Sequence, residues 1–126
     1  MDIILSNASG KPIYEQISDQ VKEQILLGQL CAGDGLPSMR LLAKELRISV
    51  ITTKRAYEEL ERDGFLENVP GKGCFIAPQN RHLLREAQLR RVEGHLLQAM
   101  DEARKGGFTL SELHETLDLL YKGDEL

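Results

Sequence analysis

The spacing of apolar residues changes twice along this chain, and these changes constrain the fold more than any other feature. From residue 12 to residue 63, apolar residues recur every three or four positions, the period of helices that bury one face. Residues 65–77 then form two short β-compatible runs around a Pro-Gly-Lys-Gly turn. The helical period returns after residue 80. The sequence therefore predicts a mainly α fold with one small β-hairpin.

Three helices are expected before the hairpin, over residues 12–27, 38–46 and about 50–63. Ser49 is placed to cap the third helix, since its hydroxyl can accept a hydrogen bond from the amide of Thr52. The side chains expected to face the core are Ile13, Ile17, Val21 and Ile25 in the first helix, Leu41, Leu42 and Leu46 in the second, and Thr53, Ala56, Tyr57 and Leu60 in the third.

The hairpin is expected to pair residues 65–69 with residues 74–77 and to lie against the helices, because a two-stranded hairpin alone is marginally stable. A helix, a short helix, a tight turn, a third helix and a hairpin, in this order, describe a winged helix-turn-helix. We therefore expect residues 1–78 to form a winged helix-turn-helix DNA-binding domain. Residues 79–126 are expected to form a short helical dimerisation tail.

The tail is predicted to hold two helices, the second beginning near Thr109, whose spacing from Glu112 fits a capping box. Two such helices cannot easily bury both of their apolar stripes within one chain, and exposed stripes of this extent indicate a partner. A second copy of the chain is the simplest partner, giving a homodimer. The alternative is that the tail folds back on the first helix of its own chain. The predicted dimerisation residues are Leu84, Val92, Leu96, Met100, Leu113, Leu117 and Leu120.

The charge of the whole chain conceals a local basic segment. The 126 residues carry a net charge of −4, which by itself argues against a nucleic-acid partner. Residues 40–55, however, hold five basic side chains and one acidic side chain. Binding to a polyanion depends on the local field at the contact face. An anionic partner is therefore expected at this one place.

The residues predicted to contact DNA come from three stretches of the sequence. Arg40, at the head of the second helix, can reach a phosphate or a guanine edge. Ser49 and Thr52 begin the third helix, where free backbone amides favour phosphate oxygens. Lys72 stands between two glycines at the hairpin tip, which is thin enough to approach a minor groove. The full set is Ser38, Arg40, Ser49, Val50, Ile51, Thr52, Lys54, Arg55, Gly71, Lys72 and Gly73.

A structural interpretation competes with each of these predictions. Arg40 and Lys72 can be solvated surface cations, and Ser49 and Thr52 can serve as caps only. For Val50 and Ile51, a place in the core and a contact with DNA bases are equally supported, because apolar residues near the start of a helix are often part of the core.

Several runs of this sequence resemble the GntR family of bacterial transcription regulators. They are LPSMR at 36–40, RAYEELE at 55–61 and GKGCFI at 71–76. The run PIYEQI at 12–17, together with the short helical tail, is similar to the YtrA subfamily. This resemblance implies a dimer that binds a palindromic operator, usually as a repressor and often of a neighbouring transporter operon. By position, the family's DNA contacts correspond to Arg40, to Ser49, Val50, Ile51, Thr52 and Lys54, and to Gly71 and Lys72.

The sequence departs from the family pattern at three positions. Val50 stands where many members have an arginine, and the apolar pair of Val50 and Ile51 suits thymine methyl groups instead. Arg47 replaces a common glycine in the turn before the third helix, and Cys74 replaces a common threonine in the hairpin.

Other function classes find less support in the sequence. We find no nucleophile–base pair, metal-ligand spacing or phosphate-binding loop, so neither an enzyme nor a metal or other cofactor is expected. Two cysteines are too few for a disulfide scaffold and suit a reducing cytoplasm. No apolar run approaches the ~20 residues of a membrane span. Because winged helices also dock proteins, the alternative function is an interaction module without DNA binding. A small-molecule effector stays unidentified.

Overall fold

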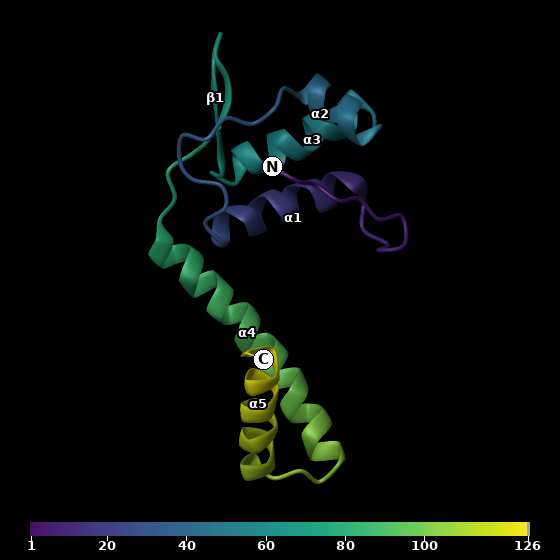
Figure 1. Ribbon diagram of the computed structural model, residues 1–126, viewed down its shortest axis with the longest axis vertical. Coiled ribbons are helices and arrows are strands. Elements are labelled where there is room, and N and C mark those ends of the chain that lie inside the picture. The colour runs from purple at the N-terminus through teal and green to yellow at the C-terminus, as the bar shows by residue number, and fades with distance from the viewer. Residues whose placement is uncertain (126) are drawn as a thin grey trace. The chain divides into compact units, whose positions relative to one another are not determined.

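The computed structural model describes residues 1–125, which form five helices and one two-stranded antiparallel sheet (Figure 1). The elements are α1 (Ile13–Leu26), α2 (Met39–Leu46), α3 (Val50–Arg62), β1 (Leu66–Val69), β2 (Gly73–Ile76), α4 (Arg81–Lys105) and α5 (Leu110–Glu125). The predicted mainly α fold with a small hairpin is confirmed. The chain divides into two compact units, Met1–Asn80 and a second that begins at Arg81.

The core of the first unit lies between α1 and α3, and α2 packs on α3 (Figure 1). Ile17 and Val21 of α1 are fully buried, as are Ala56 and Leu60 of α3. These residues stand at helical spacing because each helix buries one face and exposes the other. The core positions predicted for α3 are all buried, and those predicted for α1 are buried except Ile13, which is half-buried.

The predicted inner face of α2 is wrong at one position. Leu41 is 47% exposed, whereas Leu42 and Ala43 are buried and Leu46 is half-buried. One residue turns an α-helix by about 100°, so a face centred between Leu42 and Ala43 carries Leu41 away from α3.

Each of the two helices of the helix-turn-helix begins at a serine cap. The Ser38 hydroxyl accepts a hydrogen bond from the Leu41 amide at 3.1 Å, and the Ser49 hydroxyl accepts one from the Thr52 amide at 3.1 Å. Between the two helices, α2 ends at Arg47, whose backbone is left-handed with φ 57°. A left-handed residue at this place ends the helix within one step and lets α3 start three residues later.

Arg47 is the one non-glycine residue with a positive φ among residues 1–125, and we expect Arg47→Gly to stabilise the protein. A non-glycine residue in the left-handed conformation costs about 1–2 kcal/mol, which glycine does not incur. Part of the stability gained by Arg47→Gly is offset because glycine makes the unfolded chain more flexible. The free energy of unfolding in urea should therefore rise by about 0.5–1 kcal/mol. Arg62→Gly, in the last turn of α3, is the control and should lower stability. A loss of stability in Arg47→Gly would contradict the expectation.

The hairpin is held against the helices by a third stretch of chain. β1 and β2 pair with Leu66 opposite Ile76, and both side chains are buried. The loop after α1 runs along the other edge of β2, where the Gly33 amide donates to the Ile76 carbonyl at 2.8 Å. The Leu36 amide donates to the Cys74 carbonyl at 2.9 Å. This pairing gives the short hairpin the support that it lacks alone.

The chain before α1 is fastened to that helix by a row of glutamines. Gln16, Gln20 and Gln24 occupy every fourth position of α1, about 6 Å apart along the axis. Two residues of extended chain span a similar ~6.6 Å, so alternate residues of the segment meet successive glutamines. Gln20 bonds both the amide and the carbonyl of Ile4, at 2.8 and 2.7 Å, and Gln24 donates to the Asp2 carbonyl at 2.7 Å.

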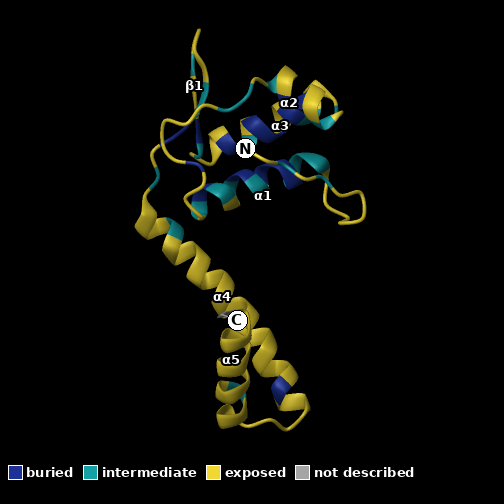
Figure 2. Cartoon of the chain, viewed as in Figure 1, coloured by how far each residue is buried: buried dark blue, intermediate teal, exposed yellow. Residues whose placement is uncertain are grey.

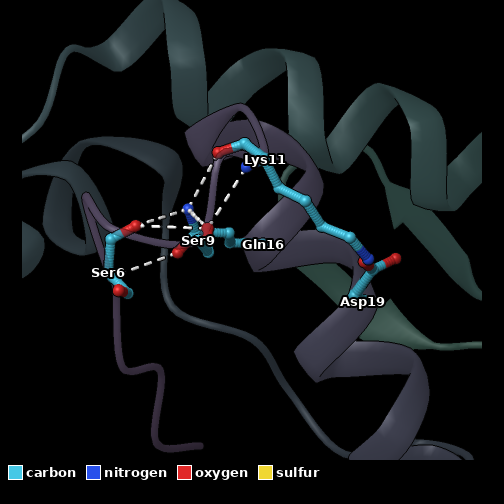
Figure 3. A network of polar contacts seen from close by, with 5 residues as sticks. All are labelled: Ser6, Ser9, Lys11, Gln16 and Asp19. Carbon is cyan, nitrogen blue, oxygen red and sulfur yellow. Dashed lines mark hydrogen bonds and ion pairs between the residues drawn. The ribbon is translucent and has the colours of Figure 1, made fainter.

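Gln16 is the most enclosed of these glutamines, with 7% of its surface exposed. Its side-chain oxygen accepts from the Ser6 amide at 2.8 Å, and its nitrogen donates to the carbonyls of Ser6 and Lys11 and to the Ser9 hydroxyl, each at 2.9 Å (Figure 3). Lys11 also pairs with Asp19, with 3.0 Å between its Nζ and the carboxylate. The loop from Ser6 to Lys11 is thus closed around one amide group.

Replacing Gln16 with alanine should lower the free energy of unfolding by about 2 kcal/mol, because buried polar groups of the loop lose their partner. Chemical denaturation followed by circular dichroism measures this change. Gln20→Ala removes hydrogen bonds in an exposed setting and serves as the control, with an expected loss under ~1 kcal/mol. Equal losses in the two variants would show that enclosure of Gln16 contributes nothing.

The second unit buries very little of its own surface (Figure 2). The predicted capping box of α5 is present, because the Thr109 hydroxyl accepts from the Glu112 amide at 3.2 Å and the Thr109 amide donates to the Glu112 carboxylate at 3.0 Å. Among the residues of α4, Ala103 alone is buried. The large apolar side chains of the unit that are exposed include Leu89, Val92, Leu96, Leu97, Met100, Leu117, Leu119, Leu120 and Tyr121.

Candidate nucleic-acid interface

The first turn of α3 combines tied hydroxyls with exposed aliphatic side chains. Ser49 caps the helix, and its hydroxyl also lies 2.8 Å from the Thr52 hydroxyl, so each already has a partner. Thr53 turns inward and is fully buried. Val50 and Ile51 point outward, with 44% and 80% of their surfaces exposed. The interpretation of these two residues as part of the core is therefore wrong.

Two basic residues of α3, Lys54 and Arg55, follow this turn and have partners within the protein. The Lys54 ammonium lies 3.8 Å from the Glu58 carboxylate, in an exposed pair one helical turn apart. Such a pair contributes little to stability and yields readily to a competing phosphate. Arg55 lies with its guanidinium 3.9 Å from the centre of the Tyr14 ring and donates to the Tyr14 hydroxyl at 3.2 Å.

Tyr14 is a neighbour of the candidate site that the sequence analysis missed. It lies in the first turn of α1, far from Arg55 in the sequence, and the packing of α1 on α3 brings the two together. A cation over an aromatic face is held by the ring quadrupole, which fixes the position of the guanidinium. The signal in the sequence was an aromatic residue in the first turn of the helix, and that signal does not name its partner.

The head of α2 offers a second cation. Arg40 is the second residue of α2 and its side chain is exposed. Ser38 caps the helix and is also exposed. Arginine can address a guanine edge or a phosphate with paired donors, and a helix start adds free backbone amides.

The hairpin supplies the third element. Its tip projects away from α1 (Figure 1), and Lys72 at the tip is exposed. Gly71 and Gly73 flank Lys72 with φ of 78° and 115°, which a side chain would resist. The tip is therefore narrow as well as positively charged, a shape that can enter a groove of a duplex.

Cys74 lies behind this tip and is half-buried in β2. Burial raises the pKa of the Cys74 thiol, and the Glu61 carboxylate raises it further. The thiol is therefore protonated near neutral pH and adds no negative charge to the hairpin. Cys31, the other free cysteine, is exposed in the loop after α1.

Two further observations concern other functions. In the stretch that the structure describes, no group of three or more His, Cys, Asp or Glu side chains could hold a metal ion. Within residues 1–125, no helix has both the length and the apolar character needed to cross a bilayer.

Comparisons with known proteins agree with this geometry. Residues 13–76 match the family model described as bacterial regulatory proteins, gntR family. The HTH-type transcriptional repressor YtrA of Bacillus subtilis strain 168 is 39% identical over 107 residues, which cover 85% of this chain and 82% of that protein. These relatives are regulators of transcription and not enzymes.

Solved structures show the same fold over most of the chain. A transcriptional regulator from Oenococcus oeni, 28% identical, superposes with a TM-score of 0.76 and covers 93% of this chain and 97% of its own. YtrA from Sulfolobus acidocaldarius, a GntR-family transcription factor, is 36% identical with a TM-score of 0.58, over 72% of this chain and 97% of its own. Both its winged helix-turn-helix fold and its sequence similarity show that the chain belongs to the GntR family of bacterial transcription regulators.

Proposed function

We propose that this protein is a homodimeric repressor that binds a palindromic operator. Residues 1–78 bind the DNA, and residues 79–126 form the dimer. The protein acts in the cytoplasm, and its operator controls a nearby operon of transporter type. The assignment of the operon rests on the YtrA-like resemblance alone.

The DNA face is supported chiefly by the first turn of α3, where Val50 and Ile51 are exposed at the start of the recognition helix. The exposed cations Arg40, Lys54 and Lys72 belong to the three elements that a winged helix uses. Phosphate contacts from such cations set the position of the protein on the duplex, and contacts to base edges supply the sequence preference.

The dimer is supported by the exposure of the second unit. A helix of 25 residues that buries one alanine cannot be stabilised by its own packing. Leu89, Val92, Leu96 and Met100 recur every three or four residues along it, which forms an apolar stripe. A second copy presents the same stripe, so a two-fold axis covers both at once.

Selection of duplexes from a random pool by the full-length protein tests the proposal. We expect enrichment of an inverted repeat whose half-sites are separated by about one helical turn, ~10 base pairs, or a multiple of it. Enrichment of a single unrepeated site would contradict the dimer. If no sequence is enriched at low salt, DNA binding itself is wrong and the interaction-module alternative is favoured.

A further inference from the structure

The first turn of α3, the recognition helix, offers a base pair few polar groups that are without a partner. The hydroxyls of Ser49 and Thr52 bond each other and the helix start. Lys54 is paired with Glu58, and Arg55 is held on Tyr14. Val50 and Ile51 also point outward from the first turn, and both are aliphatic. They can contact a base without first breaking a hydrogen bond or ion pair within the protein.

The geometry points to these two side chains as readers of thymine methyl groups in the major groove. This inference rests on the proposed function, because it names the chemical group that the same DNA face recognises. In the major groove only thymine carries a methyl group among the four unmodified bases. An aliphatic side chain gains nothing from the donors and acceptors of the other bases, but it can bury that methyl group.

Ile51 carries the larger part of this reading. It is 80% exposed, so the free protein leaves nearly the whole side chain in water at the start of α3. Contact with a thymine methyl removes apolar surface of both partners from water. Burial of one methyl corresponds to about fourfold in affinity, and a symmetric operator presents it in both half-sites. Loss of the methyl from both half-sites should therefore weaken binding about 15-fold.

The experiment uses the full-length protein and a duplex selected from the random pool. Thymines of that duplex are replaced by deoxyuridine in symmetric pairs, which removes the methyl group and leaves base pairing unchanged. We expect one or two of these pairs to weaken equilibrium binding about 15-fold, while the other pairs change it less than about twofold. In Ile51→Ala the sensitive pairs should lose most of their effect, because the side chain that buries the methyl is gone.

Ile4→Ala is the matched control, since Ile4 is 79% exposed on the segment before α1 and outside the three DNA-contacting elements. It should bind the thymine duplex like the wild type and keep the full uracil effect. Thermal melting checks the fold of both variants, and neither exposed position should lower it. Wild-type binding that is insensitive to every uracil pair would overturn the inference, as would an unchanged uracil effect in both Ile51→Ala and Val50→Ala. Failure to select any duplex would instead remove the proposed function and this inference together.

Discussion

A variant with aspartates at Leu96 and Leu117 should be monomeric and should bind its operator at least ~100-fold more weakly than the wild type. Both leucines lie on the predicted dimerisation stripes and are 47% and 44% exposed in the single chain. A carboxylate buried in an apolar interface has no partner there, and the cost of burying its charge should make the dimer dissociate. Without the dimer the second half-site is no longer bound intramolecularly, and the avidity of 10²- to 10⁴-fold is lost.

Sedimentation equilibrium and operator binding measure the two parts of this prediction. The matched control places aspartates at Leu97 and Leu119, which are neighbours of the first pair and more exposed, at 61% and 63%. This control should stay dimeric. A dimeric test variant would show that the stripes are not the interface, and a monomeric control would show that the interface is on another face of these helices.

Tyr57→Ala should lower the free energy of unfolding by about 3–5 kcal/mol. Tyr57 is among the largest fully buried side chains, with 2% of its surface exposed. Its loss would leave a cavity in the core against which α3 packs. Its hydroxyl also donates to the Pro37 carbonyl at 2.7 Å, which ties α3 to the chain that leads into α2. Tyr57→Phe removes that bond alone and should cost about 1–2 kcal/mol.

Ile4→Ala is the control, because Ile4 is 79% exposed outside the proposed dimer tail and its loss should cost less than ~0.5 kcal/mol. Urea unfolding at one protein concentration compares the three variants. A change in Tyr57→Ala as small as that of the control would contradict the placement of Tyr57 in the core.

The same residue makes stability depend on alkaline pH. Burial raises the pKa of Tyr57 far above its usual value, with negative charges at Cys74 and Glu45 adding to the effect. In the unfolded chain the Tyr57 phenol ionises at about pH 10, whereas in the folded chain it keeps its proton at that pH. The folded state then binds more protons, so stability falls as pH rises above ~10. Tyr57→Phe should lose less stability than the wild type between pH 9 and pH 11.

The sequence predicted the elements of the first unit well because each of its three helices buries a single face. The stripe through Ala56, Tyr57 and Leu60 is visible as spacing alone, and the Ser49 cap is visible in the residue type that precedes the helix. The error at Leu41 has the same origin: three leucines in a short helix fit more than one face, and only the packing against α3 chooses among them.

The remaining features depend on contacts between distant parts of the chain. Arg55 was predicted as a DNA contact from its place on the outer side of α3, and the structure gives it a second neighbour in Tyr14. The glutamines of α1 are plain in the sequence, but their partner is a backbone path that no periodicity encodes. The roles of the DNA-contacting residues stay predictions until binding is measured.

The salt dependence of operator binding tests the central claim most directly, which is that an acidic chain binds a duplex through one local basic face. Two copies that each contribute Arg40, Lys54 and Lys72 neutralise about six phosphates. The logarithm of the binding constant should then fall against the logarithm of salt concentration with a slope of about −5. A slope close to zero would contradict the account, because the face described here would then not be the one that meets the DNA.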